Sequence, residues 1–222
     1  MPPKFSCITA TYNQLPFLKK AKRDWEQQTI KDFEWILAID GSTDGTWEWA
    51  KENKIKAVKG RGNYDWSIYN KAAKIADGEY LTWVMGDSYP KDDYLEQLLI
   101  LLRPERVVNG IRINVDKRGQ FVSKDWRVGR ITEEVDAIKT TWDKMTLNSL
   151  AMPKKLYEEI GGMYEKYRGY GRADYDLIIR ASRAGATMWC APRAIIYHID
   201  HPGRIADSPG NIRLFEKRFP GV

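Results

Sequence analysis

The chain has 222 residues, 43% of them hydrophobic and 30% charged, which is typical of a globular protein and excludes an intrinsically disordered chain. The 36 Lys and Arg residues outnumber the 30 Asp and Glu residues, and the net charge of +6 favours anionic partners such as phosphates or acidic lipid surfaces. Because the basic residues are spread along the chain and form no run, a dedicated nucleic-acid-binding protein is not expected.

The sequence also predicts the cellular compartment of the protein. No segment approaches 18 uninterrupted apolar residues, and residues 1–6 lack the charged and apolar regions of a signal peptide. We therefore expect a cytoplasmic protein whose basic charge allows peripheral contact with a membrane. Cys7 and Cys190 lie in apolar stretches and are expected to be free thiols.

The first half of the chain alternates between strand and helix patterns. Residues 5–10 and 33–39 are apolar strands, and helical patterns follow them from Pro16 and from Thr46. Further elements of the same kind are a helix over 68–75, a strand over 80–85, a helix from Pro90 to Leu102 and a strand over 107–115. This alternation predicts an α/β fold with a doubly wound, mostly parallel central sheet.

The second half is less regular. Residues 116–146 are polar and aromatic and predict a long excursion from the core, a feature that is often functional in compact domains. After it come a short strand near Leu150, a helix over 153–160, a helix from Asp174 to Gly185 and a strand over 188–197. No repeat or linker divides the sequence, so we expect one domain.

Three loops follow predicted strands, at residues 9–13, 40–45 and 86–89. In open α/β sheets, ligands bind outside the carboxyl ends of the strands, so Asp40 and Asp87 are expected to face one crevice. The alternative is that the acidic and hydroxyl residues of the 40–45 loop, Asp40, Ser42 and Asp44, merely shape a turn and cap the next helix.

Asp87 and the two histidines of the chain are candidate metal ligands. An Asp after a strand could hold Mg²⁺ or Mn²⁺, which would neutralise the charge that develops on a nucleotide diphosphate leaving group. His198 and His201 follow the last strand, and histidine is a common ligand for borderline metals such as Mn²⁺. Both histidines could equally be ordinary polar residues of a loop.

A second carboxylate site lies at the start of the helix near residue 174. Asp174 and Asp176 could simply cap that helix, but Tyr170 between two glycines predicts an irregular loop suited to close approach by a ligand. Asp174 could there act as a general base. Trp126, Trp142 and Tyr170 fall in loop-like regions, where their rings could stack on a sugar or a base.

Taken together, these segments resemble the family-2 glycosyltransferases, which adopt the GT-A fold. The resemblance runs from about Phe5 to His201, and its most specific match is the acidic turn AIDGSTDGT over 38–46. The other matching segments are SCITATYN over 6–13, GNYDWSIYNK over 62–71, DGEY over 77–80, GGMYE over 161–165 and GYGRADYDL over 169–177.

The resemblance implies roles for particular residues. It assigns the nucleotide to a set of loop residues: Thr9, Ala10, Tyr12, Asp40 and Asp65. It implies a single GT-A domain over 1–222, with a nucleotide-binding half over about 1–115 and an acceptor-binding and catalytic half over about 116–222. Asp174 would take the proton of the acceptor hydroxyl, and the loop aromatics would contact the acceptor.

The sequence departs from the family pattern at two places. The acidic pair that the family carries at its metal site is reduced to Asp87 in MGDS over 85–88, and the usual Glu before the catalytic Asp is Ala173. Related enzymes often use a late histidine as a metal ligand, which implies His198, with His201 as the fallback.

We therefore expect a metal-dependent, inverting transferase that uses Mn²⁺ or Mg²⁺. It would move a sugar from a nucleotide diphosphate sugar, with UDP-sugars the first choice, to a hydroxyl of a carbohydrate, a lipid-linked glycan or a protein-linked glycan. Because both acidic motifs have lost one member, a catalytically impaired nucleotide-sugar-binding protein stays an alternative. A nucleotidyltransferase would carry a glycine-rich phosphate loop after its first strand, which residues 11–16 lack.

Overall fold

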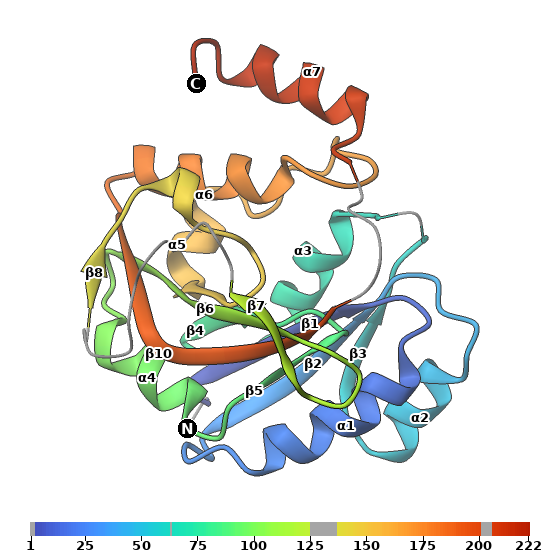
Figure 1. The fold of residues 1–222 in the computed structure, drawn as a ribbon. Helices are drawn as coiled ribbons and strands as arrows, with labels where there is room; N and C mark the ends of the chain where they lie inside the picture. The colour runs from blue at the N-terminus through green and yellow to red at the C-terminus, as the bar shows by residue number, and fades with distance from the viewer. Residues whose placement is uncertain (1–2, 63, 125–136, 201–205) are drawn as a thin grey trace.

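The computed structural model of the chain describes residues 3–62, 64–124, 137–200 and 206–222. Helices lie on both sides of one large sheet (Figure 1). In chain order the elements are β1 (Phe5–Thr11), α1 (Leu15–Glu26), β2 (Phe33–Ile39), α2 (Thr46–Glu52), β3 (Lys56–Lys59), α3 (Ser67–Lys74), β4 (Tyr80–Trp83), β5 (Ser88–Pro90), α4 (Tyr94–Leu101), β6 (Arg106–Val115), β7 (Phe121–Lys124), β8 (Ile138–Lys139), the 3-10 helix η2 (Trp142–Lys144), β9 (Leu150–Pro153), α5 (Lys154–Glu159), α6 (Ala173–Arg183), β10 (Thr187–Ile199) and α7 (Pro209–Arg218).

The sheet has the strand order β3-β2-β1-β4-β9-β6-β10-β5, with β7 beside β6 and β8 beside β10. Strands β3, β2, β1 and β4 are parallel neighbours. Strand β9 is antiparallel to both β4 and β6, so β6 and its parallel partner β10 point the same way as the first four. The predicted α/β fold with a mostly parallel central sheet is confirmed.

The strands bury both of their faces. In β1 and β4, Ile8 and Trp83 pack into a core with residues of α3, α5 and α6, whereas Cys7 and Tyr80 pack into a second core with residues of α1 and α4. Successive residues of a strand point to opposite faces, so continuous apolar strands need helices on both sides. Because β1, β2 and β4 are parallel, their carboxyl ends lie at the same edge of the sheet, and so do the loops that follow them.

Most predicted elements lie where the sequence places them. Helix α1 buries Leu18, Ala21 and Trp25, the residues of its expected apolar face. The strand predicted over 80–85 is shorter, ending at Trp83, and the helix predicted over 68–75 ends at Lys74. Cys7 and Cys190 are buried free thiols as predicted, and burial raises the pKa of both, that of Cys190 to about 12.

Several elements have no counterpart in the sequence prediction. They are β3, β5, β7, β8 and α7. The four strands have at most four residues each, too few for a period-2 pattern to stand out, and α7 buries only Asn211 and Phe215. No helix within the described ranges is long and apolar enough to cross a membrane.

Candidate functional site

The acidic turn after β2 is organised by its own carboxylates. Asp40 accepts hydrogen bonds from the backbone N–H groups of Gly62 (2.8 Å, to Oδ1) and Asp65 (3.2 Å, to Oδ2). A Cβ atom on Gly60 would lie 2.4 Å from Asp40 Oδ1, so only glycine allows this approach. Asp40 therefore holds the 60–65 loop against the end of β2.

Asp44 and Ser42 shape this turn and bind the starts of the helices, which is the alternative role that the sequence allows for them. Asp44 Oδ1 accepts from the backbone N–H (3.2 Å) and the hydroxyl (2.6 Å) of Thr46, and its Oδ2 accepts from the N–H of Leu15 (2.9 Å). Ser42 Oγ accepts from the N–H of Asn13 at 3.0 Å. Asp44 and Ser42 thus join the starts of α1 and α2 into one unit.

Asp65 is a buried carboxylate with many partners. Its side chain is 3% exposed, and Arg61 donates to it from Nε at 2.8 Å while the N–H of Ser67 donates at 3.2 Å. The Arg61 guanidinium holds the pKa of Asp65 well below its usual range, against the opposing effect of burial. The structure therefore places Asp65 beside Asp40 as a fixed negative charge.

The loops after β1 and β4 meet at the edge of the sheet. The N–H of Gly86 donates to the carbonyl of Ala10 at 2.9 Å, and a Cβ atom on Gly86 would lie 2.3 Å from Gln14 Oε1. Thr9 is buried in β1, and its hydroxyl accepts a hydrogen bond from Trp35 Nε1. Ala10 is half-buried, and Tyr12 is 60% exposed.

The two proposed metal ligands, far apart in the chain, lie together. His198 Nε2 and Asp87 Oδ2 are 3.6 Å apart, and each side chain is 15% exposed. Strand β10 brings His198 to this place, because β5, which follows Asp87, is antiparallel to β10 and pairs Ser88 with His198. Asn114 Oδ1 lies 3.0 Å from His198 Nδ1 and fixes the ring. His201 lies outside the described residues.

Asp174 and Asp176 have separate surroundings in the first turn of α6. Asp174 is half-buried and its Oδ1 accepts from the N–H of Tyr175 at 3.0 Å. Asp176 is fully buried and accepts from Arg180 Nε (2.6 Å), Arg218 Nε (2.5 Å) and the Tyr167 hydroxyl (3.1 Å). Neither carboxylate is the N-cap of α6, because that position belongs to Arg172.

Tyr69, which the sequence pattern assigns only to a helix face, is a buried residue of α3. Burial raises the pKa of the Tyr69 phenol, and the charges of Asp174, Asp40 and Asp87 raise it further. The hydroxyl also lies 3.6 Å from Met85 Sδ. Three carboxylates from distant parts of the sequence thus act on one side chain of α3. Tyr69 has the apolar spacing of a core residue, so no local signal distinguishes it.

The predicted acceptor-binding aromatics are placed differently from one another. Tyr170 is 44% exposed and meets Tyr64 edge to face, with ring centroids 6.1 Å apart. Trp142 is half-buried and packs edge to face on Tyr175, which follows Asp174. Trp126 lies outside the described residues.

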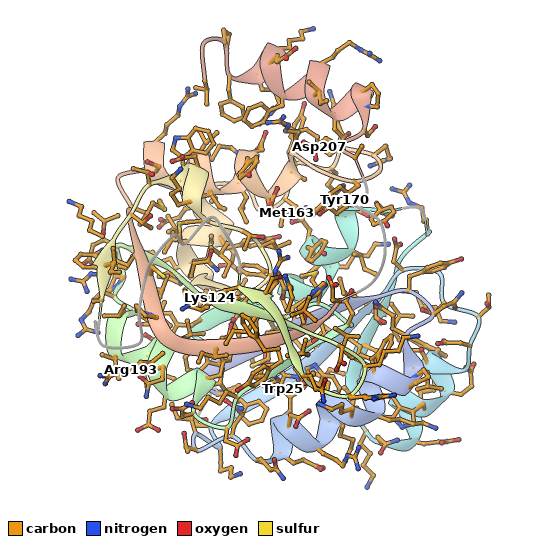
Figure 2. All side chains as sticks on the ribbon, in the orientation of Figure 1. Trp25, Lys124, Met163, Tyr170, Arg193 and Asp207 are labelled. Atoms are coloured by element: carbon orange, nitrogen blue, oxygen red, sulfur yellow. The ribbon has the colours of Figure 1, made fainter. Side chains whose placement is uncertain are left out.

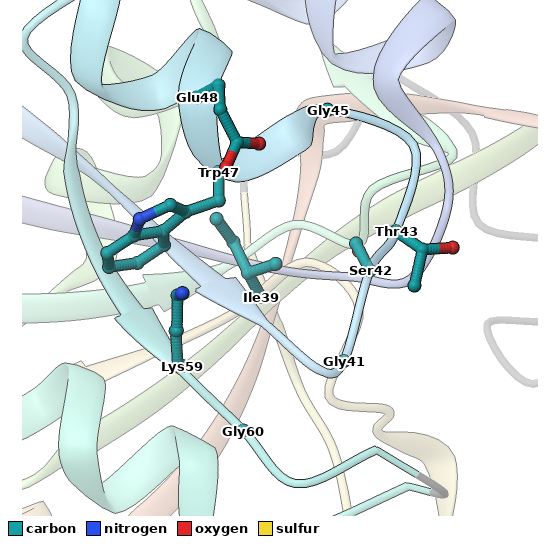
Figure 3. Close-up of a pocket in the computed structure, with 9 residues that line it drawn as sticks. All are labelled: Ile39, Gly41, Ser42, Thr43, Gly45, Trp47, Glu48, Lys59 and Gly60. Atoms are coloured by element: carbon teal, nitrogen blue, oxygen red, sulfur yellow. The ribbon is translucent and has the colours of Figure 1, made fainter.

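A cavity of about 350 Å³ lies beside the acidic turn (Figure 3). Its walls come from the 41–45 turn, the start of α2 and the end of β3, and Lys59 lies over the Trp47 ring, 4.4 Å from its centroid. Asp87, Asp174 and His198 do not line it. The cavity therefore borders the turn that carries Asp40 and does not include the candidate metal ligands or the candidate base.

Comparison with known structures supports the fold. TarS 1–349 of S. aureus, solved in complex with UDP-GlcNAc, superposes with a TM-score of 0.75 over 96% of this chain and 66% of TarS 1–349, at 19% identity. TarS 1–349 in complex with UDP gives a TM-score of 0.69 over 90% of this chain and 61% of that chain, also at 19% identity. The architecture is the GT-A fold of such enzymes.

Sequence relatives agree over a shorter range. Two proteins of Bacillus subtilis (strain 168) each match 44% of this chain. EpsH, which is assigned to the glycosyltransferases by inference, is 28% identical over the matched segment. EpsJ, an uncharacterized glycosyltransferase, is 30% identical. The matched segment covers 30% of the length of either relative. The family model "Glycosyl transferase family 2" matches residues 6–176, well over half of the chain. The protein therefore belongs to glycosyl transferase family 2.

Proposed function

We propose that this glycosyltransferase moves a sugar from a nucleoside diphosphate sugar, with UDP-sugars as the first choice, to an acceptor hydroxyl with inversion of configuration. The observation that carries the proposal is the approach of Asp87 Oδ2, in the loop that follows the carboxyl end of β4, to His198 Nε2, 3.6 Å away. The UDP-GlcNAc and UDP complexes of TarS support a uridine donor for this chain.

The nucleotide is held by the loops after β1 and β2 and by the 60–65 loop. Each carboxylate oxygen of Asp40 accepts one hydrogen bond from a backbone N–H group. The remaining lone pairs of the carboxylate can accept hydrogen bonds from the N–H groups of a nucleotide base. Tyr12 offers an exposed ring beside it, and the backbone of Thr9 and Ala10 and the fixed charge of Asp65 complete the set. In this proposal residues 1–115 form the nucleotide half and 116–222 the acceptor half of one domain.

Asp87 and His198 fit a divalent cation. Asn114 Nδ2 donates to Ser123 Oγ, so its Oδ1 accepts from His198 Nδ1 and the Nε2 atom faces Asp87, the tautomer that metal-ligating histidines use. Two ligands of one ion at about 2.1 Å lie about 3 to 4 Å apart, which accommodates the observed separation. No group of three His, Cys, Asp or Glu side chains gathers in the described part of the chain, so diphosphate oxygens and water would complete the shell. Mn²⁺ or Mg²⁺ bound there supplies positive charge beside the leaving diphosphate.

Asp174 acts as the general base. It accepts the proton of the acceptor hydroxyl while the oxygen forms a bond to the anomeric carbon. The bond from that carbon to the diphosphate breaks, and its electron pair leaves with the nucleoside diphosphate. The buried phenol of Tyr69 has a raised pKa and stays neutral, so it removes no proton from the acceptor. The rate gain comes from placing the reactants in line and from fixed charges.

Tyr170 and Trp142 bind the acceptor in this proposal. Both rings lie beside the segment that carries Asp174, and an aromatic face suits the apolar face of a sugar. Trp126 keeps its predicted acceptor role without structural support. Carbohydrates, lipid-linked glycans and protein-linked glycans all present such sugars.

A thermal-shift panel tests the donor and the metal together. Uridine, guanosine and thymidine diphosphate sugars are compared with Mn²⁺, with Mg²⁺ and with chelator, since a ligand of the folded state raises Tm. We expect a UDP-sugar to raise Tm, and chelator, Asp87→Asn and His198→Ala to remove the metal-dependent part. The surface control Asn53→Asp should keep it. An equal shift with and without metal would rule out the Asp87 and His198 site, and no shift for any donor would reject the proposed function.

The base is tested with Asp174→Asn. We expect a normal donor-induced shift in Tm and a fall of about 10²- to 10⁴-fold in the rate of nucleotide release with glycoside acceptors. Asp92→Asn, an exposed carboxylate change, is the matched control. Transfer by Asp174→Asn at the rate of the unaltered protein would exclude Asp174 as the base. Donor binding by the unaltered protein without any transfer would favour the nucleotide-sugar-binding alternative.

A further inference from the structure

Helix α7 follows the segment that matches the family, which ends at residue 176. In Figure 1 it lies beyond α6, on the side away from the sheet. Its first residues nevertheless reach the loop that precedes Asp174. We call residues 169–171 the GYG loop.

Asn211 is the main link between α7 and the GYG loop. The side chain is 2% exposed. Its Nδ2 lies 3.3, 3.2 and 3.0 Å from the carbonyl oxygens of Gly169, Tyr170 and Gly171, and its Oδ1 accepts from the N–H of Arg168 at 3.0 Å. A side-chain amide carries two donor hydrogens and one acceptor oxygen, and in Asn211 both groups are directed at the four consecutive residues 168–171.

The backbone before α7 closes on the same loop. The N–H of Ser208 donates to the carbonyl of Tyr170 at 2.9 Å, and Arg172 Nε pairs with Asp207 Oδ2 at 2.8 Å. A Cβ atom on Gly171 would lie 2.1 Å from Asp207 Oδ1, and the φ of +89° at this residue also requires glycine. Figure 2 labels Tyr170 and Asp207 in this region.

A second link lies two residues beyond Asp174. Arg218, at the end of α7, and Arg180 of α6 donate to the fully buried carboxylate of Asp176. A buried charge without such partners would be strongly destabilising, so this ion pair fixes α7 on α6. The segment that carries Asp174 is therefore held by α7 both before and after it.

We propose that Asn211 is a positioning residue, through which α7 sets the GYG loop and hence the place of Asp174 and Tyr170 relative to the donor. The proposal rests on the proposed function, in which Asp174 is the base. Asn211 touches no reacting atom, so its loss should lower kcat while donor affinity stays unchanged. The GYG loop has two glycines with positive φ and no strand partner on the loop residues themselves, so side-chain contacts hold its shape, those of Asn211 together with the bond from Trp66 Nε1 to the Gly169 carbonyl at 3.0 Å.

The test uses the full chain with Asn211→Asp, which keeps the acceptor for the Arg168 N–H and places an anionic oxygen against three carbonyls. Asn211→Ser, a smaller change, serves if the first variant does not fold. Phe219→Leu is the matched control, because it weakens the packing behind α7 and leaves the loop hydrogen bonds intact. Nucleotide release from the donor chosen by the panel, the donor-induced Tm shift and amide hydrogen exchange of residues 168–176 are measured.

We expect the Asn211 variants to lower kcat about 10- to 100-fold with an unchanged donor-induced shift, as misplacement of a catalytic group by about 1 Å does. Faster exchange should be confined to residues 168–176, and Phe219→Leu should change neither kcat nor that exchange beyond its effect on Tm. Unchanged exchange, or faster exchange with an unchanged kcat, would overturn the proposal. An unaltered protein that releases no nucleotide from any donor would instead reject the proposed function, and the catalytic role of Asn211 with it.

Discussion

The acidic residues of the site differ in what surrounds each carboxylate. Asp65 and Asp176 are buried and accept hydrogen bonds from arginines, and Asp44 accepts from the starts of two helices. A buried charge is stable only with such partners, so Asp65 and Asp176 support the fold, and the half-buried Asp44 does so through its bonds to the helix starts. Asp65 in addition supplies the fixed charge of the proposed nucleotide site. Asp87 lies beside a histidine, and Asp174 is half-buried at the start of α6. Residue type and spacing are alike in both groups, and only the contacts separate them.

Asp65 makes the stability depend on pH. Its pKa is lower in the folded state than the unfolded value of about 3.9, so its contribution is present above that value and is lost as pH falls. We expect Asp65→Asn to lower the free energy of unfolding at pH 7 by about 1 to 3 kcal/mol, because the Asp65 side chain loses charge-assisted bonds. Urea unfolding at pH 7 and pH 3 measures this, with Asp92→Asn as control. A difference that persists undiminished at pH 3 would contradict the assignment.

At the scale of elements, the structure depends on contacts between neighbouring strand–turn–helix units. The loops after β1 and β2 bind each other through Asn13, Ser42 and Asp44. The 60–65 loop is tied to the β2 turn by Asp40, and the residue that follows it, Trp66, donates from Nε1 to the carbonyl of Gly169 in the GYG loop at 3.0 Å. Hydrogen bonds therefore link the turn after β2, the 60–65 loop and the GYG loop to one another.

Asp44→Ala tests the link between the first two units. The variant leaves the N–H groups of Leu15 and Thr46 without their partner at the starts of α1 and α2. We expect a loss of about 1 to 2 kcal/mol in the free energy of unfolding, the usual effect of removing a helix cap. Chemical unfolding measures it, and Asp92→Ala should change stability by less than about 0.5 kcal/mol. Equal stabilities of the two variants would show that water replaces the Asp44 contacts.

At the scale of the whole molecule, one sheet supports a core on each face. Trp83 lies near the middle of the sheet, is fully buried and packs on Tyr157 with ring centroids 5.5 Å apart. The same strand contributes Tyr80 to the opposite core. Damage to one face is therefore expected to weaken both faces together.

We expect Trp83→Ala to reduce the free energy of unfolding by about 3 to 5 kcal/mol, since it leaves a large cavity in a close-packed core. Unfolding should remain one transition, with near- and far-ultraviolet circular dichroism changing together. Trp47→Ala, at a half-buried ring beside the 350 Å³ cavity, should have a smaller effect. Two separated transitions in Trp83→Ala would show that the two cores unfold independently.

The sequence by itself determined the alternating core elements. The signals are local: they are apolar strands such as 5–11 and 33–39, turn residues such as those over 40–45, and the helical spacing of Leu18, Ala21 and Trp25. The strands and helices form at the positions of these patterns. A parallel sheet brings the loops after its strands to one edge, and the expectation that Asp40 and Asp87 face one crevice rests on this topology.

Tertiary structure decided the rest, because burial and partners depend on segments far apart in the chain. Nothing near Asp176 in the sequence indicates that Arg218, 42 residues later, would bind it, or that Asn211 would hold the GYG loop. Tyr69 carries the spacing of a core residue, yet burial and the charges of three carboxylates distant in the sequence together raise its pKa. Local patterns report which face of an element is apolar, whereas the role of a polar side chain depends on which distant group satisfies it.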